Sequence, residues 1–80
     1  MLTPEQVEGY IRQGMPCEHA AVQGDGQHFE AVIVSGEFAG KSRVQRHQVV
    51  YKALGDRMRA EIHALSMQTL TPEEWSAQAK

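Results

Sequence analysis

Residues 38–51, with the sequence FAGKSRVQRHQVVY, decide how this chain folds. The segment starts as a loop broken by Gly40, and Ser42 is placed to cap a helix, with Gln45 completing a capping box. Helical spacing of the apolar residues then predicts the longest helix of the protein, which passes through Gly55 and ends near Arg59. We expect one face of this helix to pack firmly on a sheet: Val44, His47, Val50, Tyr51, Leu54 and Met58.

A shorter helix is predicted before it, over about residues 4–13. Thr3 is its cap, and Pro4 occupies the first helical position, where its missing N–H carries no penalty. Gly14 is predicted to end this helix in the left-handed conformation.

Three strands complete the pattern. Residues 18–23 alternate, residues 28–34 are rich in β-branched side chains, and the Gly24-Asp25-Gly26 turn between them predicts an antiparallel hairpin. Residues 62–70 alternate again. Thr71-Pro72-Glu73-Glu74 then repeats the capping pattern of Thr3-Pro4-Glu5-Gln6 and starts a last short helix anchored by Trp75. Because a strand–helix–strand crossover favours parallel strands, the order α-β-β-α-β-α predicts a mixed three-stranded sheet with helices on one face, which is an α+β fold.

Composition indicates one ordinary soluble domain over residues 1–80. The net charge is −2 and 41% of the residues are hydrophobic, which is not typical of a disordered or strongly basic protein. Cys17 is the one cysteine, so the chain forms no internal disulfide, in keeping with a reducing compartment. The sequence shows no signal peptide and no membrane-spanning run, so we expect a cytoplasmic protein without membrane attachment, and a monomer when isolated.

The densest basic cluster is formed by Lys41, Arg43 and Arg46. Residues 36–42 have three residues between the two glycines, whereas a phosphate-binding loop needs four, so that motif is rejected. The helix start at Ser42, flanked by two of these cations, is a candidate anion site or an ordinary solvated helix end.

The histidines do not form a recognisable zinc motif, because no HxxxH or CxxC spacing is present. His19 is predicted to face solvent and His47 to be a partly buried, hydrogen-bonded residue. His28 and His63 stand at the starts of the second and third strands, so in a parallel pair both imidazoles lie at one corner of the sheet. Two imidazoles would supply half of the ligands of a metal site. From the residues alone, the favoured interpretation is nevertheless that His28 and His63 are two unrelated surface histidines. No nucleophile–base set or carboxylate pair is visible, so an enzyme is not expected.

Several stretches, taken together and in order over nearly the whole chain, resemble the BolA family, and most closely its BolA/IbaG-like bacterial branch. They are GDGQHFE at residues 24–30, VS at 34–35, FAGKSRVQRHQVVY at 38–51, IHALS at 62–66 and TLTPEEW at 69–75. The resemblance implies a class II KH-like fold. It also implies partnership with a monothiol glutaredoxin, across which a bridging [2Fe–2S] cluster is shared with glutathione and a glutaredoxin cysteine. No cluster is then expected in the isolated chain.

In the family, the cluster ligands of the BolA side are a histidine near the start of the last strand and a histidine or cysteine of the hairpin region. Carried over, they match His63 and His28, and Cys17 lies too early in the chain to match. The expected function is thus an adaptor in iron–sulfur trafficking, iron homeostasis or stress response.

Two alternatives remain open. One is a KH-like DNA-binding transcriptional regulator whose basic cluster contacts phosphate, although the loop here is Gly-x-x-x-Gly and the net charge is negative. The other is a protein-interaction module in which metal plays no part. Lys41, Arg43 and Arg46 are better candidates for docking a partner protein than for reading DNA.

Overall fold

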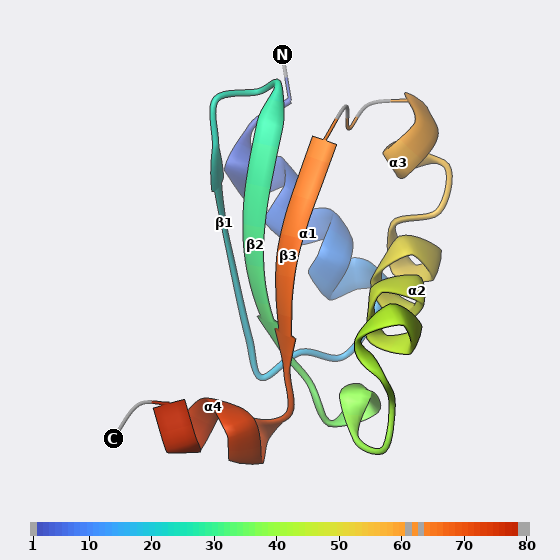
Figure 1. Ribbon diagram of the computed structural model, residues 1–80. Helices are drawn as coiled ribbons and strands as arrows, with labels where there is room; N and C mark the ends of the chain where they lie inside the picture. Colours follow the sequence, from blue (N-terminus) through green and yellow to red (C-terminus); the bar gives the residue numbers. More distant parts are fainter. Residues whose placement is uncertain (1, 61, 63, 79–80) are drawn as a thin grey trace.

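The computed structural model of this protein describes residues 2–60, 62 and 64–78. Its elements appear in Figure 1 in this order: α1 (Pro4–Gly14), β1 (His19–Gly24), β2 (His28–Val34), a 3-10 turn (Gly36–Phe38), α2 (Arg43–Leu54), α3 (Arg57–Ala60), β3 (Ala64–Leu70) and α4 (Pro72–Gln78). The predicted α-β-β-α-β-α order is confirmed, and the short helix α3 is an addition to it. None of the described helices is long and apolar enough to cross a membrane.

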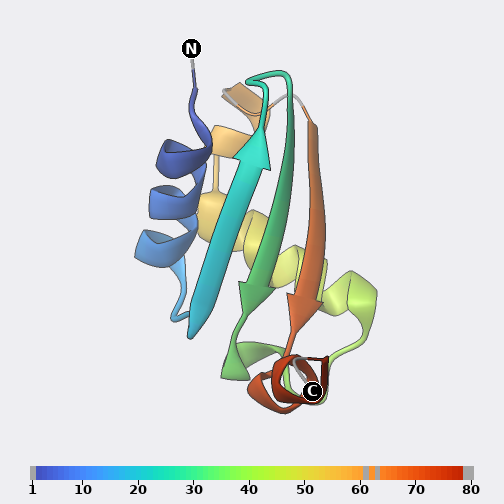
Figure 2. The ribbon, with the colours of Figure 1, turned by 90° about the vertical axis from the view of Figure 1, so that its left-hand side faces the viewer.

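The three strands form one mixed sheet in the order β1-β2-β3. β1 runs antiparallel to β2, with His19 opposite Val34, and β3 runs parallel to β2, with His28 opposite Ala64. Helices α1 and α2 lie on one face of the sheet, and α4 lies across the end where β2 and β3 finish, as Figure 2 shows. The α+β prediction is therefore confirmed, and the arrangement is compatible with a class II KH-like fold.

The core fills the space between the sheet and the two covering helices. Its fully buried members come from α1, β2, the 3-10 turn and α2: Val7, Ile11, Phe29, Ile33, Phe38 and Val50. Phe38 anchors the loop before α2, as its isolation among small and polar neighbours predicts. Burying side chains of this size contributes about 1.5–3 kcal/mol each, so this cluster supplies much of the driving force for folding.

The role predicted for Gly14 is wrong. Gly14 is the last helical residue of α1, and the cap is Met15, whose backbone is extended (φ −155°) and whose N–H donates to the Ile11 carbonyl. A Cβ at position 14 would stand 2.8 Å from both the carbonyl carbon and the Cβ of Ala53, and it would overlap the Ala53 oxygen. Glycine is needed here because α1 and α2 approach closely, not because the chain turns left-handed.

The extent of α2 also differs from the prediction. The helix ends at Leu54, because Gly55 takes a positive φ of 60°, and Met58 belongs to α3. The packed face is centred on Val50 and Leu54, which are buried, whereas Val44 is 66% exposed.

Tyr51, another residue of the predicted face, is 42% exposed. It follows Val50 by one residue, which turns its side chain by about 100° around the helix axis. The apolar stripe that reaches the core is therefore narrower than the sequence predicts.

Candidate functional site

The hairpin turn fixes the position of His28. The Asp25 carboxylate accepts hydrogen bonds from the backbone N–H groups of Gln27 and His28, both at 2.9 Å. These bonds lower the pKa of Asp25 below its usual range, because they stabilise the ionised carboxylate. The bond from the His28 backbone has the largest effect, followed by that from Gln27. Gly26 provides the positive φ of 94° that lets the chain reverse. The Asp25 carboxylate thus holds the backbone of His28 at the start of β2.

The imidazole of His28 is exposed on the face of the sheet that α1 and α2 leave open. Its Nε2 lies 3.3 Å from the Ser66 hydroxyl of β3, and which atom donates depends on the imidazole tautomer. The contact follows from the parallel register, which places His28 opposite Ala64, two residues before Ser66. Sequence reasoning did not single out Ser66, although this residue lies within the strand predicted over residues 62–70.

His63 lies outside the described residues, so its predicted convergence with His28 stays a prediction. In the chain it immediately precedes Ala64, the residue that pairs with His28.

The donor chemistry at this corner suits half of a shared site. Within residues 2–60, 62 and 64–78, no three side chains of the metal-binding types gather into a group that holds a metal by themselves. An exposed imidazole at a strand start can supply one nitrogen ligand, and the chain carries a second histidine one residue before the paired strand. Two such nitrogen donors would leave the other coordination positions of a two-iron cluster to be filled from outside this chain.

Cys17 is not part of this corner. The next residue, Glu18, donates a backbone hydrogen bond to the carbonyl of Val34, the last residue of β2. Cys17 therefore lies near that end of β2, whereas His28 is at the other end. The thiol donates weakly to the Met15 carbonyl at 3.5 Å. Burial raises the pKa of the Cys17 thiol above its ordinary value, although the Arg12 cation works in the other direction, so the thiol is a poor source of thiolate.

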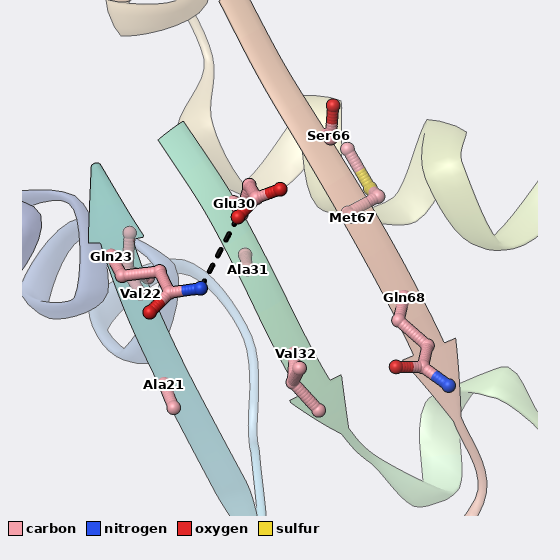
Figure 3. A pocket seen from close by; sticks show the side chains of 9 residues that line it. All are labelled: Ala21, Val22, Gln23, Glu30, Ala31, Val32, Ser66, Met67 and Gln68. Atoms are coloured by element: carbon pink, nitrogen blue, oxygen red, sulfur yellow. Dashed lines mark hydrogen bonds between the residues drawn. The ribbon is translucent and has the colours of Figure 1, made fainter. Parts of the chain in front are cut away.

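The open face of the sheet carries a shallow hollow of about 500 Å³ (Figure 3). Small side chains form its floor, including Ala21 and Val32, and its upper rim includes Ser66, the residue that contacts His28. Gln23 donates to the Glu30 carboxylate across the β1–β2 pair at 3.2 Å. The hollow therefore adjoins the His28 corner, and the Glu30 carboxylate is the charged group in its lining.

The other two histidines have structural contacts. His19 is half-buried and stacks on Trp75 of α4, with ring centroids 4.9 Å apart, so it fastens α4 to the sheet rather than only facing solvent. His47 is half-buried, as predicted, and its ring lies at 75° to the Tyr51 ring, with the ring centroids 6.5 Å apart. No hydrogen bond joins the His47 ring to another described residue, so its predicted hydrogen bond stays a prediction.

The basic cluster is less available than its sequence indicates, because Arg46 has a structural role. Its guanidinium donates to the carbonyls of Lys41 (3.0 Å) and Thr69 (3.2 Å) and forms a two-pronged ion pair with Glu74, at 2.7 and 3.3 Å. Only 14% of the Arg46 side chain is exposed. Lys41 donates to the Glu37 carbonyl at 2.9 Å, and its side chain and that of Arg43 stay exposed.

Glu74 is the residue of this group that sequence reasoning assigned only to helix capping. Its carboxylate also accepts from the Thr71 N–H, and the Thr71 hydroxyl accepts from the Glu74 N–H, so the predicted cap of α4 is confirmed. The Arg46 hydrogen bond, followed by that of the Thr71 backbone, lowers the pKa of Glu74 to about 2. The carboxylate thus joins α4 to α2 and neutralises one of the three cations.

Comparison with known proteins gives a consistent result. The family model for BolA-like proteins matches residues 2–74. The DNA-binding transcriptional regulator BolA of Haemophilus influenzae is 45% identical over 60 residues, covering 75% of this chain and 58% of that protein. The acid stress protein IbaG of Escherichia coli is 33% identical over 76 residues, covering 94% of this chain and 90% of that protein.

A solved structure gives the same result for the fold. A bolA protein homologue from Coxiella burnetii superposes with a TM-score of 0.85 and 40% identity, over 95% of this chain and 99% of the homologue. The chain spans only 52–58% of the length of the first five curated relatives it matches. The names of the two relatives above describe a regulator and a stress protein, and neither denotes a catalytic activity.

Proposed function

Because this chain belongs to the BolA family, we propose that it is an adaptor that binds a monothiol glutaredoxin and shares a bridging [2Fe–2S] cluster with it. The observation that carries the proposal is the exposed imidazole of His28, held opposite Ala64 by the parallel register, with His63 next to Ala64 in the chain. His28 and His63 are the proposed ligands of this chain. The glutaredoxin cysteine and glutathione are the proposed thiolate ligands on the other side.

The residues around His28 support such a role. The Asp25 carboxylate holds the His28 backbone, and the Ser66 hydroxyl lies beside Nε2, so the ring has a preferred orientation before a partner arrives. Histidine ligation, when the cluster is bound, raises its reduction potential relative to four thiolates. Only neutral imidazole binds metal, so we expect the shared complex to weaken as acid protonates these rings.

Replacing either proposed ligand is expected to abolish the signature of the shared cluster. We expect His63→Ala and His28→Ala each to reduce the visible absorption and circular dichroism of the mixed complex to those of the glutaredoxin alone. The reason is that the loss of one imidazole leaves an iron without its fourth ligand. The measurement is anaerobic reconstitution of this chain with a monothiol glutaredoxin, glutathione, iron and sulfide, followed by spectroscopy.

Two variants serve as matched controls. His19→Phe keeps the aromatic stack on Trp75, and His47→Ala removes a half-buried imidazole from α2. Both should leave the mixed spectrum unchanged, because neither histidine lies at the His28 corner. His19 pairs with Val34, at the opposite end of β2 from His28, and His47 lies beside the last residues of β3. A His63→Ala complex that retained the full spectrum would remove this residue from the ligand set, and an unaltered glutaredoxin spectrum with the wild-type chain would exclude cluster sharing.

DNA binding is a second candidate function, favoured by the name of the Haemophilus influenzae relative and by the exposed Lys41 and Arg43. Since Arg46 is engaged with Glu74 and two carbonyls, we expect two phosphate contacts instead of three. Two contacts correspond to a slope of about −1.8 for log affinity against log salt, whereas three would give about −2.7. Titration of a labelled duplex between 50 and 200 mM salt measures this slope.

The double variant Lys41→Ala with Arg43→Ala should then remove nearly all of the salt dependence. Lys52→Ala, which removes an exposed cation from the last turn of α2, should not change it. A salt-independent affinity, or a slope unaffected by the double variant, would exclude this cluster as the DNA contact.

A further inference from the structure

The outer edge of β3 offers backbone groups that no hydrogen bond of the described residues uses. β3 is the last strand of the sheet, and the Leu70 carbonyl accepts from the Ser35 N–H on the β2 side. In a parallel pair, successive residues alternate between facing the neighbouring strand and facing away. Leu65, Met67 and Thr69 therefore direct their N–H and C=O groups away from β2.

This edge lacks the usual protection against added strands. The seven residues of β3, ALSMQTL, include neither a charged residue nor a proline, which are the features that normally discourage strand pairing. The Arg46 guanidinium covers the Thr69 carbonyl at one end. Along the rest of the strand, Figure 2 shows β3 as the outermost strand, with α2 behind the sheet and α4 at its end.

A groove of about 750 Å³ lies beside the second half of β3, between that strand, the start of α2 and α4. Its lining includes Met67 and Thr69 of the strand, and Lys41, Arg43 and His47 on the helix side. Arg46 is neutralised by Glu74, so Lys41 and Arg43 are the cations left to give the groove its charge. The site thus combines a free strand edge with a local positive charge on a chain of net charge −2.

We propose that this groove binds an extended acidic segment of a partner protein, which adds to the sheet as a strand beside β3. The backbone of the segment bonds Leu65, Met67 and the Thr69 N–H, and its acidic side chains face Lys41 and Arg43. About five residues of extended chain span this edge, at about 3.3 Å per residue. Main-chain bonds supply affinity in this mode of recognition, and the alternate side chains supply selectivity.

The observations favour a peptide over other occupants. The edge alternates donors and acceptors, which match a peptide backbone, whereas a nucleic-acid backbone presents phosphate acceptors only. A second copy of this chain is also a poor match, because its own β3 brings no acidic side chain to Lys41 and Arg43. The groove borders the final residues of β3, whereas His28 lies opposite Ala64 at the start of that strand. The proposal therefore does not depend on cluster binding.

The test uses the full chain and a fluorescein-labelled peptide, Thr-Glu-Val-Glu-Thr-Glu, with the matching Thr-Lys-Val-Lys-Thr-Lys peptide as the control. Fluorescence anisotropy should show saturable binding of the acidic peptide and at least tenfold weaker binding of the basic one. Amide hydrogen exchange followed by NMR should show new protection at Leu65, Met67 and Thr69. Ser66 and Gln68 should change little, because their amides already bond β2.

Variants separate the charge contribution from the backbone contribution. Lys41→Glu with Arg43→Glu should weaken binding at least tenfold, whereas Lys52→Glu should leave it unchanged. Met67→Pro removes an outward N–H without touching the β2 ladder and should also abolish binding. Thermal unfolding of Met67→Pro, compared with that of Met67→Ala, shows whether the proline variant folds. If the proline variant does not fold, the amide exchange pattern of the wild-type chain decides the test.

Three results would overturn the proposal. They are equal affinity for the acidic and basic peptides, protection that does not alternate along β3, and a short single-stranded DNA that protects the same amides at lower concentration. The last result would assign the groove to nucleic acid.

Discussion

Gly14→Ala is expected to destabilise this protein by about 1–3 kcal/mol, whereas Gly9→Ala is expected to stabilise it by about 0.5–1 kcal/mol. Both changes add one methyl group to the same helix, α1. At position 14 the methyl group would overlap the backbone of Ala53 on α2, which cannot move without separating the two helices. At position 9 it would meet no atom within 4 Å, so only the gain in helix propensity remains.

Thermal and urea unfolding of the two variants measure this difference. For a domain of this size, 1 kcal/mol corresponds to a change of about 4–8 °C in the unfolding midpoint. The two midpoints should therefore move in opposite directions from that of the wild-type chain. A Gly14→Ala variant as stable as Gly9→Ala would mean that α1 and α2 are not in close contact at Ala53.

Arg46→Ala is expected to cost about 2–3 kcal/mol and to loosen α4. The change removes charged hydrogen bonds to the Lys41 and Thr69 carbonyls, each worth roughly 1.5–3 kcal/mol less the cost of ordering the side chain. It also releases Glu74, so the polar and aromatic contacts that hold α4 within residues 64–78 would be reduced to its Thr71 cap and the stack of Trp75 on His19. Urea unfolding measures the first effect, and amide exchange in α4 measures the second.

Glu74→Gln isolates the ion pair from the two carbonyl bonds, because Arg46 remains in place. Since the pKa of Glu74 is lowered to about 2 from an ordinary value of 4.5, the pair stabilises the folded state fully above pH 4.5 and loses its effect as pH falls towards 2. The stability difference between wild type and Glu74→Gln should therefore be constant from pH 5 to 7 and shrink below pH 4.5. A difference that grew on acidification would contradict the assignment.

Arg46 bonds two backbone carbonyls and pairs with Glu74, which explains why a basic cluster in a sequence does not by itself predict a binding site. On the sequence, Lys41, Arg43 and Arg46 are equivalent candidates for docking a partner or a phosphate backbone. In the fold, Arg46 is bound to a carboxylate 28 positions later in the chain, and it is nearly buried. Such a pairing has no local signature, because it depends on α4 returning to the start of α2.

Local chemistry determined most of the architecture. The capping boxes at Thr3, Ser42 and Thr71 each form, because a capping box involves only residues three positions apart. The hairpin and its turn follow from alternation and from the Gly24-Asp25-Gly26 segment. The parallel pairing of β2 with β3 follows from the strand–helix–strand crossover through α2, and the sequence therefore predicts the end of the sheet at which His28 lies.

Only the tertiary structure decided which side of each element is buried and which polar groups are already in use. It showed that Gly14 serves the contact between α1 and α2, that Val44 and Tyr51 face outward, and that Ser66 lies beside the His28 ring. These features involve residues on different elements, whose relative rotation and spacing depend on the packing of the whole core. Periodicity and capping concern neighbours along the chain, so they determine the elements but not the contacts between them.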